Sequence, residues 1–293
     1  RWVKVCKAFG LTVDVIEAEW GKPLDPAAFE AALTADTEKA IKAVIVTHSE
    51  TSSGVLNDLE TIAKATKAHG EALIIADAVT SLGACNVPID DWGLDIVASG
   101  SQKGYMIPPG LGFVSMSDRA WSAYEKSTLP KFYFDLGPYR KSAAKNTTPI
   151  TPPVSLFFAL KVALGMMREE GLEGIFSRHQ RLQQSTRAAM KALNLPLFAA
   201  DEVASPAVTA VMPHGVEAEA IRSTMRKQFD IALAGGQDHL KGKIFRIGHL
   251  GFVGDRDIIT AVSALEATLT SLGATGFTSG AGLAAAQSVL MAD

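Results

Sequence analysis

Two ionisable side chains, Asp77 and Lys103, follow predicted buried strands and could act together in catalysis. Asp77 comes directly after the apolar segment 72–76, and Lys103 stands 26 positions later, behind the polar run 99–102. The carboxyl ends of neighbouring parallel strands meet at one edge of a sheet, where α/β proteins bind ligands. A desolvated carboxylate there needs a cationic partner to stay ionised, and a partly desolvated lysine can attack an aldehyde. The alternatives are a cap or turn residue at Asp77 and a solvated lysine at 103.

A lysine and a carboxylate at one site are the two groups that one cofactor needs. Pyridoxal phosphate is held through a Schiff base to a lysine, and a carboxylate opposite its pyridine nitrogen tunes the ring. A third candidate is Arg246, in the predicted strand 245–247, since a guanidinium can bind a carboxylate through two parallel hydrogen bonds. The alternative at Arg246 is an internal salt bridge to an Asp or Glu.

The elements that must position these residues alternate between strand and helix in the first half of the chain. Alternation of this kind predicts a mixed, mostly parallel sheet with helices on its faces, that is, an α/β fold. The predicted strands are 11–16, 43–47, 72–76, 95–98 and 111–116, and the predicted helices are 26–35 and a helix from Asn57 or Asp58 to His69. The first residues, 1–9, read as the end of a further helix.

The second half has a different pattern. Two long helices, 154–170 and 172–193, meet at Gly171, and strands at 208–212 and 245–247 alternate with helices at 217–229 and 255–272. We therefore expect a large domain over 1–170 and a smaller α+β domain over 171–273. The segment 274–293 is rich in Gly, Ala, Ser and Thr and is expected to be a flexible tail.

Composition excludes several classes of function. The chain has 47% hydrophobic and 20% charged residues, and 28 Lys and Arg against 31 Asp and Glu give a net charge of −3. This charge argues against nucleic acid or an anionic membrane as a partner. The two cysteines argue against a disulfide scaffold or zinc finger, so a cytoplasmic location is expected. The six histidines show no metal-ligand spacing, and no metal is predicted.

Five segments in order resemble the class V aminotransferases of pyridoxal phosphate fold type I, the aspartate aminotransferase-like fold. More narrowly, they resemble alanine-glyoxylate and serine-glyoxylate aminotransferases. The matching segments are THSETSSGV (47–55), ADAVTSLGA (76–84), ASGSQKGYMIPPG (98–110), TPPVSLFFAL (151–160) and FRIGHLG (245–251).

The resemblance implies a role for each matched position. Lys103 would form the Schiff base and move a proton, Asp77 would hold the pyridinium nitrogen protonated, and Arg246 would bind the substrate carboxylate. Val79 would press on one face of the ring, and Thr51 would lie near the cofactor's phenolic oxygen. Core packing at Val79 and an ordinary turn at Thr51 are the alternatives.

Two further positions concern the cofactor phosphate. Gln102 matches a phosphate-binding amide, and it also differs from the histidine that usually precedes the lysine in the similar cysteine desulfurases. Thr151 matches a residue that reaches the phosphate of the neighbouring subunit, which implies a homodimer with active sites at the subunit interface. A helix cap before Pro152 is the alternative for Thr151.

The family's phosphate loop and ring-stacking aromatic residue have no match in this sequence, so we expect a further N-terminal portion before Arg1. A loop of that kind supplies backbone donors at a helix N-terminus.

The expected function is a ping-pong transfer of an amino group from alanine or serine to glyoxylate, so amino acids and 2-oxo acids are the expected small-molecule partners. The alternatives are another class V reaction, such as lyase or desulfurase chemistry, and a non-catalytic interaction subunit derived from the family.

Overall fold

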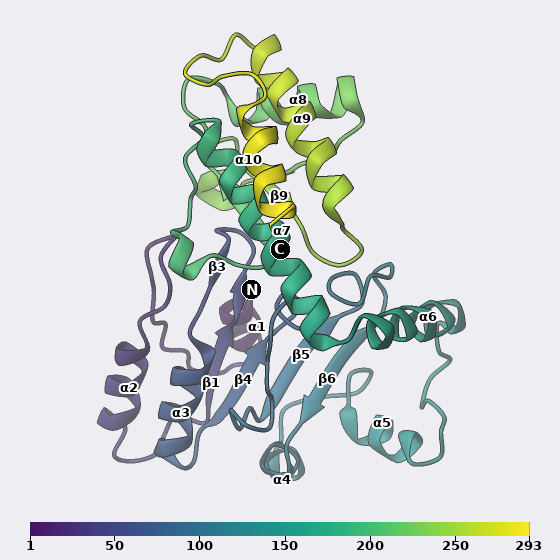
Figure 1. Cartoon of the computed structure of the whole chain (residues 1–293). Coiled ribbons are helices and arrows are strands. Elements are labelled where there is room, and N and C mark those ends of the chain that lie inside the picture. The colour runs from purple at the N-terminus through teal and green to yellow at the C-terminus, as the bar shows by residue number, and fades with distance from the viewer. Residues whose placement is uncertain (293) are drawn as a thin grey trace.

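The computed structural model describes residues 1–292, and its larger sheet carries the two strand ends predicted above. The strand order is β1-β4-β5-β6, with β1, β4 and β5 parallel and β6 antiparallel to β5. Register pairs Thr47 with Asp77 and Asp77 with Ala98, so the carboxyl ends of the three parallel strands are level. The bounds are Ala43–Thr47, Leu73–Asp77, Ile96–Gly100 and Gly112–Met116 for β1, β4, β5 and β6 (Figure 1).

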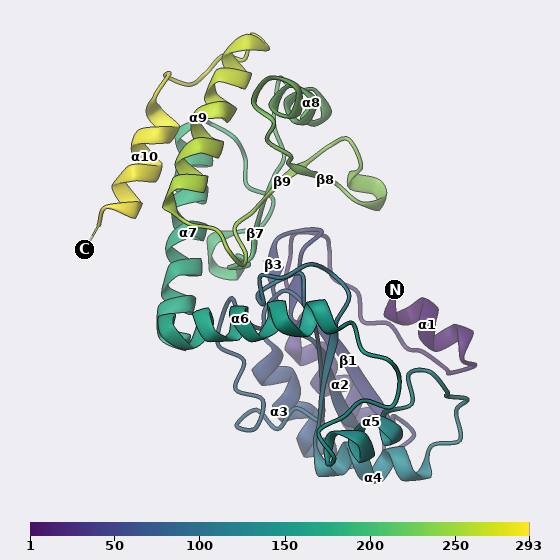
Figure 2. The ribbon, with the colours of Figure 1, turned by 90° about the vertical axis from the view of Figure 1, so that its right-hand side faces the viewer.

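Helices α2 (Pro26–Ala35) and α3 (Leu59–His69) pack together, and α3 contacts β4. Each begins at an aspartate whose carboxylate accepts a backbone N–H of the first turn, as expected of a helix cap: Asp25 for α2 and Asp58 for α3. Apolar side chains of these helices and the strands form one buried cluster. Helix α1 (Trp2–Ala8) lies on the opposite side of the sheet from α3 and buries none of its residues (Figure 2).

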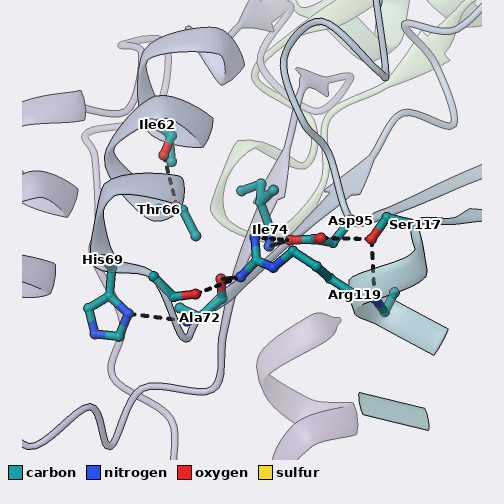
Figure 3. Close-up of polar contacts among 10 residues, drawn as sticks. Ile62, Thr66, His69, Ala72, Ile74, Asp95, Ser117 and Arg119 are labelled. Atoms are coloured by element: carbon teal, nitrogen blue, oxygen red, sulfur yellow. Dashed lines mark hydrogen bonds and ion pairs between the residues drawn. The ribbon is translucent and has the colours of Figure 1, made fainter. Parts of the chain in front are cut away.

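At the amino-terminal ends of the parallel strands, polar contacts around Asp95 connect neighbouring segments of the chain (Figure 3). The buried Asp95 carboxylate accepts the Ile74 N–H at 3.0 Å and the Ser117 hydroxyl at 2.7 Å. Arg119, from α4 (Asp118–Lys126), lies 3.4 Å from the same carboxylate and also donates to the Ala72 carbonyl at 3.0 Å. These contacts fix the strands at the edge away from Asp77.

The second half folds around a three-stranded antiparallel sheet of order β7-β9-β8. Helices α6 (Val154–Glu170) and α7 (Leu172–Ala192) meet at a sharp angle at Gly171, where φ is +76° (Figure 2). The strands are β7 (Val208–Val211), β8 (Ala234–Gly235) and β9 (Phe245–Gly248), and further helices are α8 (Ala218–Phe229) and α9 (Asp255–Ser271).

Several short elements connect these units. They are the hairpin strands β2 (Ser49–Glu50) and β3 (Val55–Leu56), helix α5 (Leu136–Ala143), and two 3-10 turns at Asp201–Val203 and Asp238–Leu240.

Two sequence predictions differ from the structure. Residues 11–16 are not a strand: Leu11 and Val15 are exposed, and this segment pairs with no strand among residues 1–292. The segment 274–293 is not wholly flexible, because Ala281–Leu290 form helix α10, which packs against α7 and α9. Its small residues allow close approach, since a Cβ at Gly282 would lie 2.7 Å from the Leu193 side chain. Position 293 lies outside the described residues.

The two halves have separate hydrophobic cores. One cluster draws on residues between 29 and 97 and the other on residues between 182 and 290. We propose that these cores mark two domains that divide at Gly171. In the part of the chain that the structure describes, every helix is too short or too polar to cross a membrane.

Candidate active site

Asp77 and Lys103 lie at the same edge of the sheet. Asp77 is the last residue of β4, and Lys103 follows the end of the adjacent parallel strand β5 by three residues. The loops after these strands touch, because a Cβ on Gly104 would lie 2.4 Å from the Leu82 carbonyl oxygen. Both side chains are half-buried.

The Asp77 carboxylate has two donors. The Val79 backbone N–H donates to Oδ1 at 3.2 Å, and the Trp2 indole N–H donates to Oδ2 at 3.0 Å. Each ionised carboxylate oxygen can accept about two hydrogen bonds, so each retains room for one more donor. The Val79 contact is the turn geometry considered above, and the Trp2 contact adds a second donor from a distant element, so the carboxylate is oriented as an acceptor.

The loop that contains Thr51 is tied to the end of β4. The His48 backbone N–H donates to the Asp77 carbonyl at 3.0 Å, and the Thr80 hydroxyl donates to the Ser49 carbonyl at 2.8 Å. Arg246, on β9, donates to the Thr51 carbonyl at 2.6 Å. A single run of contacts thus joins the segments predicted to hold the ring and the substrate.

Arg246 is half-buried and held by backbone oxygens. Its Nε donates to the Gly235 carbonyl at 2.9 Å, in addition to the contact with Thr51. Burial lowers the pKa of the Arg246 guanidinium, while the nearby Glu50 carboxylate raises it. Within residues 1–292 no carboxylate oxygen is within 4.0 Å of Arg246, so the predicted alternative of an internal salt bridge does not form. Donors of the guanidinium remain available for a ligand carboxylate.

The second half of the chain also contacts the loop 101–111 between β5 and β6, which contains Lys103 and is called the lysine loop below. A Cβ on Gly251 would lie 2.9 Å from the Lys103 carbonyl oxygen, and the φ of Gly251 is +87°. The turn is fixed from α7, since Arg178 donates to the Gly251 carbonyl at 2.9 Å and the Gly251 N–H donates to His179 Nε2 at 3.1 Å. Arg178 itself forms an ion pair with Glu170 at 2.6 Å.

Two of the three remaining predicted positions, Val79 and Gln102, lie just after β4 and β5. Val79 is half-buried. Gln102 is exposed, and its Oε1 lies beside the last residue of β5, 3.0 Å from where a Cβ on Gly100 would lie. Thr151 is exposed, and the alternative of a helix cap there is wrong, because α6 begins after Pro153 and has no side-chain cap. The start of α6 still reaches the lysine loop, since a Cβ on Gly110 would lie 2.5 Å from the Leu156 side chain.

Other reactive side chains near the site are made inert by burial. Burial raises the pKa of the Cys85 thiol to about 12 and lowers the pKa of His48 to about 4. His48 packs edge-on against Trp92 with its Nδ1 unpartnered. His249 is fully buried and bonds the Thr209 hydroxyl and the Pro206 carbonyl, which gives it a structural role.

Sequence reasoning missed two residues of this site. Trp2 reads as one residue of a short amphipathic helix, and no spacing rule links it to a residue 75 positions away. Gly251 reads as a loop glycine among several. Gly251 carried a signal, because a glycine five residues after Arg246 needs a reason, whereas no sequence signal points to Trp2.

Comparisons with known proteins agree with this geometry. The family model "Aminotransferase class-V" matches residues 1–248. A relative from Synechococcus sp. (strain PCC 6716), named "Soluble hydrogenase, small subunit", is 72% identical over 99% of this chain and 76% of its own length. A serine–glyoxylate aminotransferase from Methylorubrum extorquens is 38% identical over 99% of this chain and 74% of its own.

Solved structures extend the match to the fold. The crystal structure of ureidoglycine-glyoxylate aminotransferase from Bacillus subtilis superposes with a TM-score of 0.91 at 31% identity, over 98% of this chain and 74% of that one. The predicted fold class, that of fold type I aminotransferases, is therefore confirmed.

Proposed function

Because the chain belongs to the class V aminotransferase family, we propose that it is a pyridoxal phosphate-dependent transaminase that moves an amino group from alanine or serine to glyoxylate. One observation carries the proposal: Asp77 and Lys103 leave neighbouring parallel strands at one edge, beside the loop that Arg246 contacts. Two of the relatives described above have glyoxylate in their names, which supports this acceptor.

The residues present fit the cofactor. Both Asp77 oxygens retain room for a donor, as a protonated ring nitrogen requires, and Lys103 supplies the amine. Val79 and Thr51 would contact the ring and its phenolic oxygen, and Gln102 would contact the phosphate. When bound, pyridoxal phosphate supplies an electron sink that makes the substrate's Cα–H acidic.

Each protein group would have one task in both halves of the exchange. Asp77 holds the proton on the ring nitrogen by its negative charge. Lys103 holds the cofactor at rest and then carries the proton between the substrate Cα and the cofactor carbon. Arg246 binds the carboxylate that every amino acid and 2-oxo acid in the exchange carries, through two parallel hydrogen bonds.

A second copy of the chain would complete the site. Thr151 is exposed three residues before the first residue of α6, a helix whose Phe158 and Val162 are 67% and 65% exposed. An apolar face of this kind favours burial against another subunit. We propose a homodimer in which Thr151 reaches the partner's phosphate, in the cytoplasm, where both free cysteines would stay reduced.

The two half-reactions can be measured one after the other, first with the amino donor alone and then with glyoxylate, and this tests the transaminase proposal directly. The protein loaded with pyridoxal phosphate should form one pyruvate per site from alanine, or one hydroxypyruvate from serine, and should then form glycine when glyoxylate is added. Lys103→Ala should abolish both stages, whereas Lys64→Ala, at an exposed lysine on α3, should leave them unchanged. A loaded protein that makes neither product contradicts the proposal.

Desulfurase chemistry is the weaker enzymatic alternative. It needs a reactive thiol on a loop at the site. The pKa of about 12 for Cys85 leaves that thiol protonated at neutral pH, and Cys6 lies within α1 rather than on a loop. Cysteine should therefore yield no alanine and persulfide with this protein.

The name of the 72% identical relative favours a second candidate, association with another subunit of a soluble hydrogenase. This candidate does not compete with transamination for the same residues, because an exposed apolar surface and a catalytic edge can coexist. Pull-down of the tagged chain from a hydrogenase-containing lysate, followed by hydrogen-uptake assay of the captured complex, distinguishes it. Recovery of the chain as a homodimer without any hydrogenase subunit contradicts this association.

A further inference from the structure

The hydrogen bond between Trp2 and Asp77 joins helix α1 to the end of strand β4. Trp2 opens α1, a seven-residue helix with no buried residue, and its indole N–H reaches the Asp77 carboxylate at 3.0 Å across 75 positions of sequence. Because α1 has no fully buried side chain, this directed hydrogen bond is a principal specific link between α1 and the end of β4.

The chemistry of the donor fits a carboxylate that must stay ionised and keep its charge. An indole N–H is a donor only, so it pairs with Asp77 Oδ2 as the acceptor. It is also neutral. An arginine or lysine at this place would pair with Asp77 and reduce the negative charge that a cationic ring nitrogen needs, whereas a tryptophan orients the carboxylate and leaves that charge available.

The two donors bind different oxygens of the Asp77 carboxylate. Val79 N–H fixes Oδ1 from the same loop, and Trp2 fixes Oδ2 from a different element. With one donor on each oxygen, rotation of the carboxylate about χ2 breaks both bonds. The lone pairs that remain therefore point in fixed directions.

We propose that Trp2 is a positioning residue for Asp77, which holds the carboxylate in the orientation that meets the ring nitrogen of pyridoxal phosphate. The inference rests on the proposed function, because it assigns Asp77 to that nitrogen.

Trp2→Phe removes the donor and keeps an aromatic ring. We expect the dissociation constant for pyridoxal phosphate, measured by absorbance titration of the apoprotein, to rise about three- to tenfold, as the loss of one typical net hydrogen bond implies. We also expect the pH midpoint of the visible absorbance band of the bound cofactor to move upward, since a displaced Asp77 carboxylate stabilises the protonated ring nitrogen less. Trp20→Phe is the control, at a partly exposed tryptophan packed on His239.

A double-mutant cycle with Asp77→Asn assigns the effect to this pair. In the background of that substitution the acceptor is neutral and its hydrogen bond weaker, so Trp2→Phe should change the dissociation constant less than about twofold. A structural role for Trp2 alone would lower the midpoint of thermal unfolding equally in both backgrounds and leave the pH midpoint unmoved, and that result overturns the inference. Wild-type protein that fails to bind the cofactor at all would instead contradict the proposed function.

Discussion

At the scale of single residues, the position of Lys103 depends on glycines that sequence patterns do not single out. Gly104 lies against Leu82, and Gly251 lies against the Lys103 carbonyl oxygen. The roles of Asp77, Lys103 and Arg246 could be proposed from the sequence because a charged side chain after or within a buried strand needs a reason. Trp2 could not, since no local rule relates it to a strand end 75 positions away.

Gly251→Ala tests the contact with the lysine loop. The new Cβ would lie 2.9 Å from the Lys103 carbonyl oxygen, so the loop must shift, and we expect at least about a tenfold loss of kcat/KM because small misplacements of reacting groups are costly. The control is Gly242→Ala, where φ is +78° and no atom lies within 4 Å of the new Cβ. Both variants pay about 1–2 kcal/mol of backbone strain. Equal activity in the two variants contradicts the account.

At the scale of elements, the regular strands and helices followed their sequence signals and the exceptions have physical causes. The strands at 43–47 and 111–116 and the helices at 26–35 and 154–170 formed as their patterns predict, apart from end residues. The apolar run 11–16 pairs with nothing in the described chain, and a strand needs a partner for its backbone groups. Helix α10 was missed because its Ala and Gly residues gave little hydrophobic signal, yet they suit close packing on α7.

Glu266 holds α10 in place, which gives a second prediction. This buried carboxylate on α9 accepts the backbone N–H groups of Gly280 at 3.1 Å and Gly282 at 2.7 Å, and so caps the start of α10. Glu266→Gln should lower the free energy of unfolding by about 1–3 kcal/mol in urea titration, because an amide cannot accept through both of its polar atoms. Glu202→Gln, at an exposed position, is the matched control. An unchanged midpoint for Glu266→Gln would show that α10 docks by packing alone.

At the scale of the whole molecule, three buried histidines make stability depend on pH. Burial lowers the pKa of His48 and of His249 to about 4, and it also lowers the pKa of His179, whose Nε2 must accept the Gly251 N–H. The unfolded chain takes up these protons near pH 6.5, so between pH 6.5 and 4 it binds more protons than the folded chain. Stability is therefore full above pH 6.5 and falls as the pH decreases through this window.

The slope of this loss is measurable. Each histidine contributes at most about 1.4 kcal/mol per pH unit to the decrease in the free energy of unfolding, which urea titrations at pH 7, 6 and 5 can follow. His48→Leu should reduce the slope, since it removes one titrating ring whose Nδ1 has no partner to lose. His214→Gln, at an exposed histidine, should leave the slope unchanged. A free energy of unfolding that stays level from pH 7 to 5 contradicts the neutral, buried state of these rings.

Chemical capture of the lysine tests the central claim most directly. Pyridoxal phosphate is added to the purified protein, the Schiff base is reduced with borohydride, and the modified residue is located by peptide mass spectrometry. We expect one stable adduct per chain, on Lys103, which is lost in Lys103→Ala and reduced in yield in Asp77→Asn. An adduct spread over surface lysines, or absent from Lys103 in a folded protein, would contradict it.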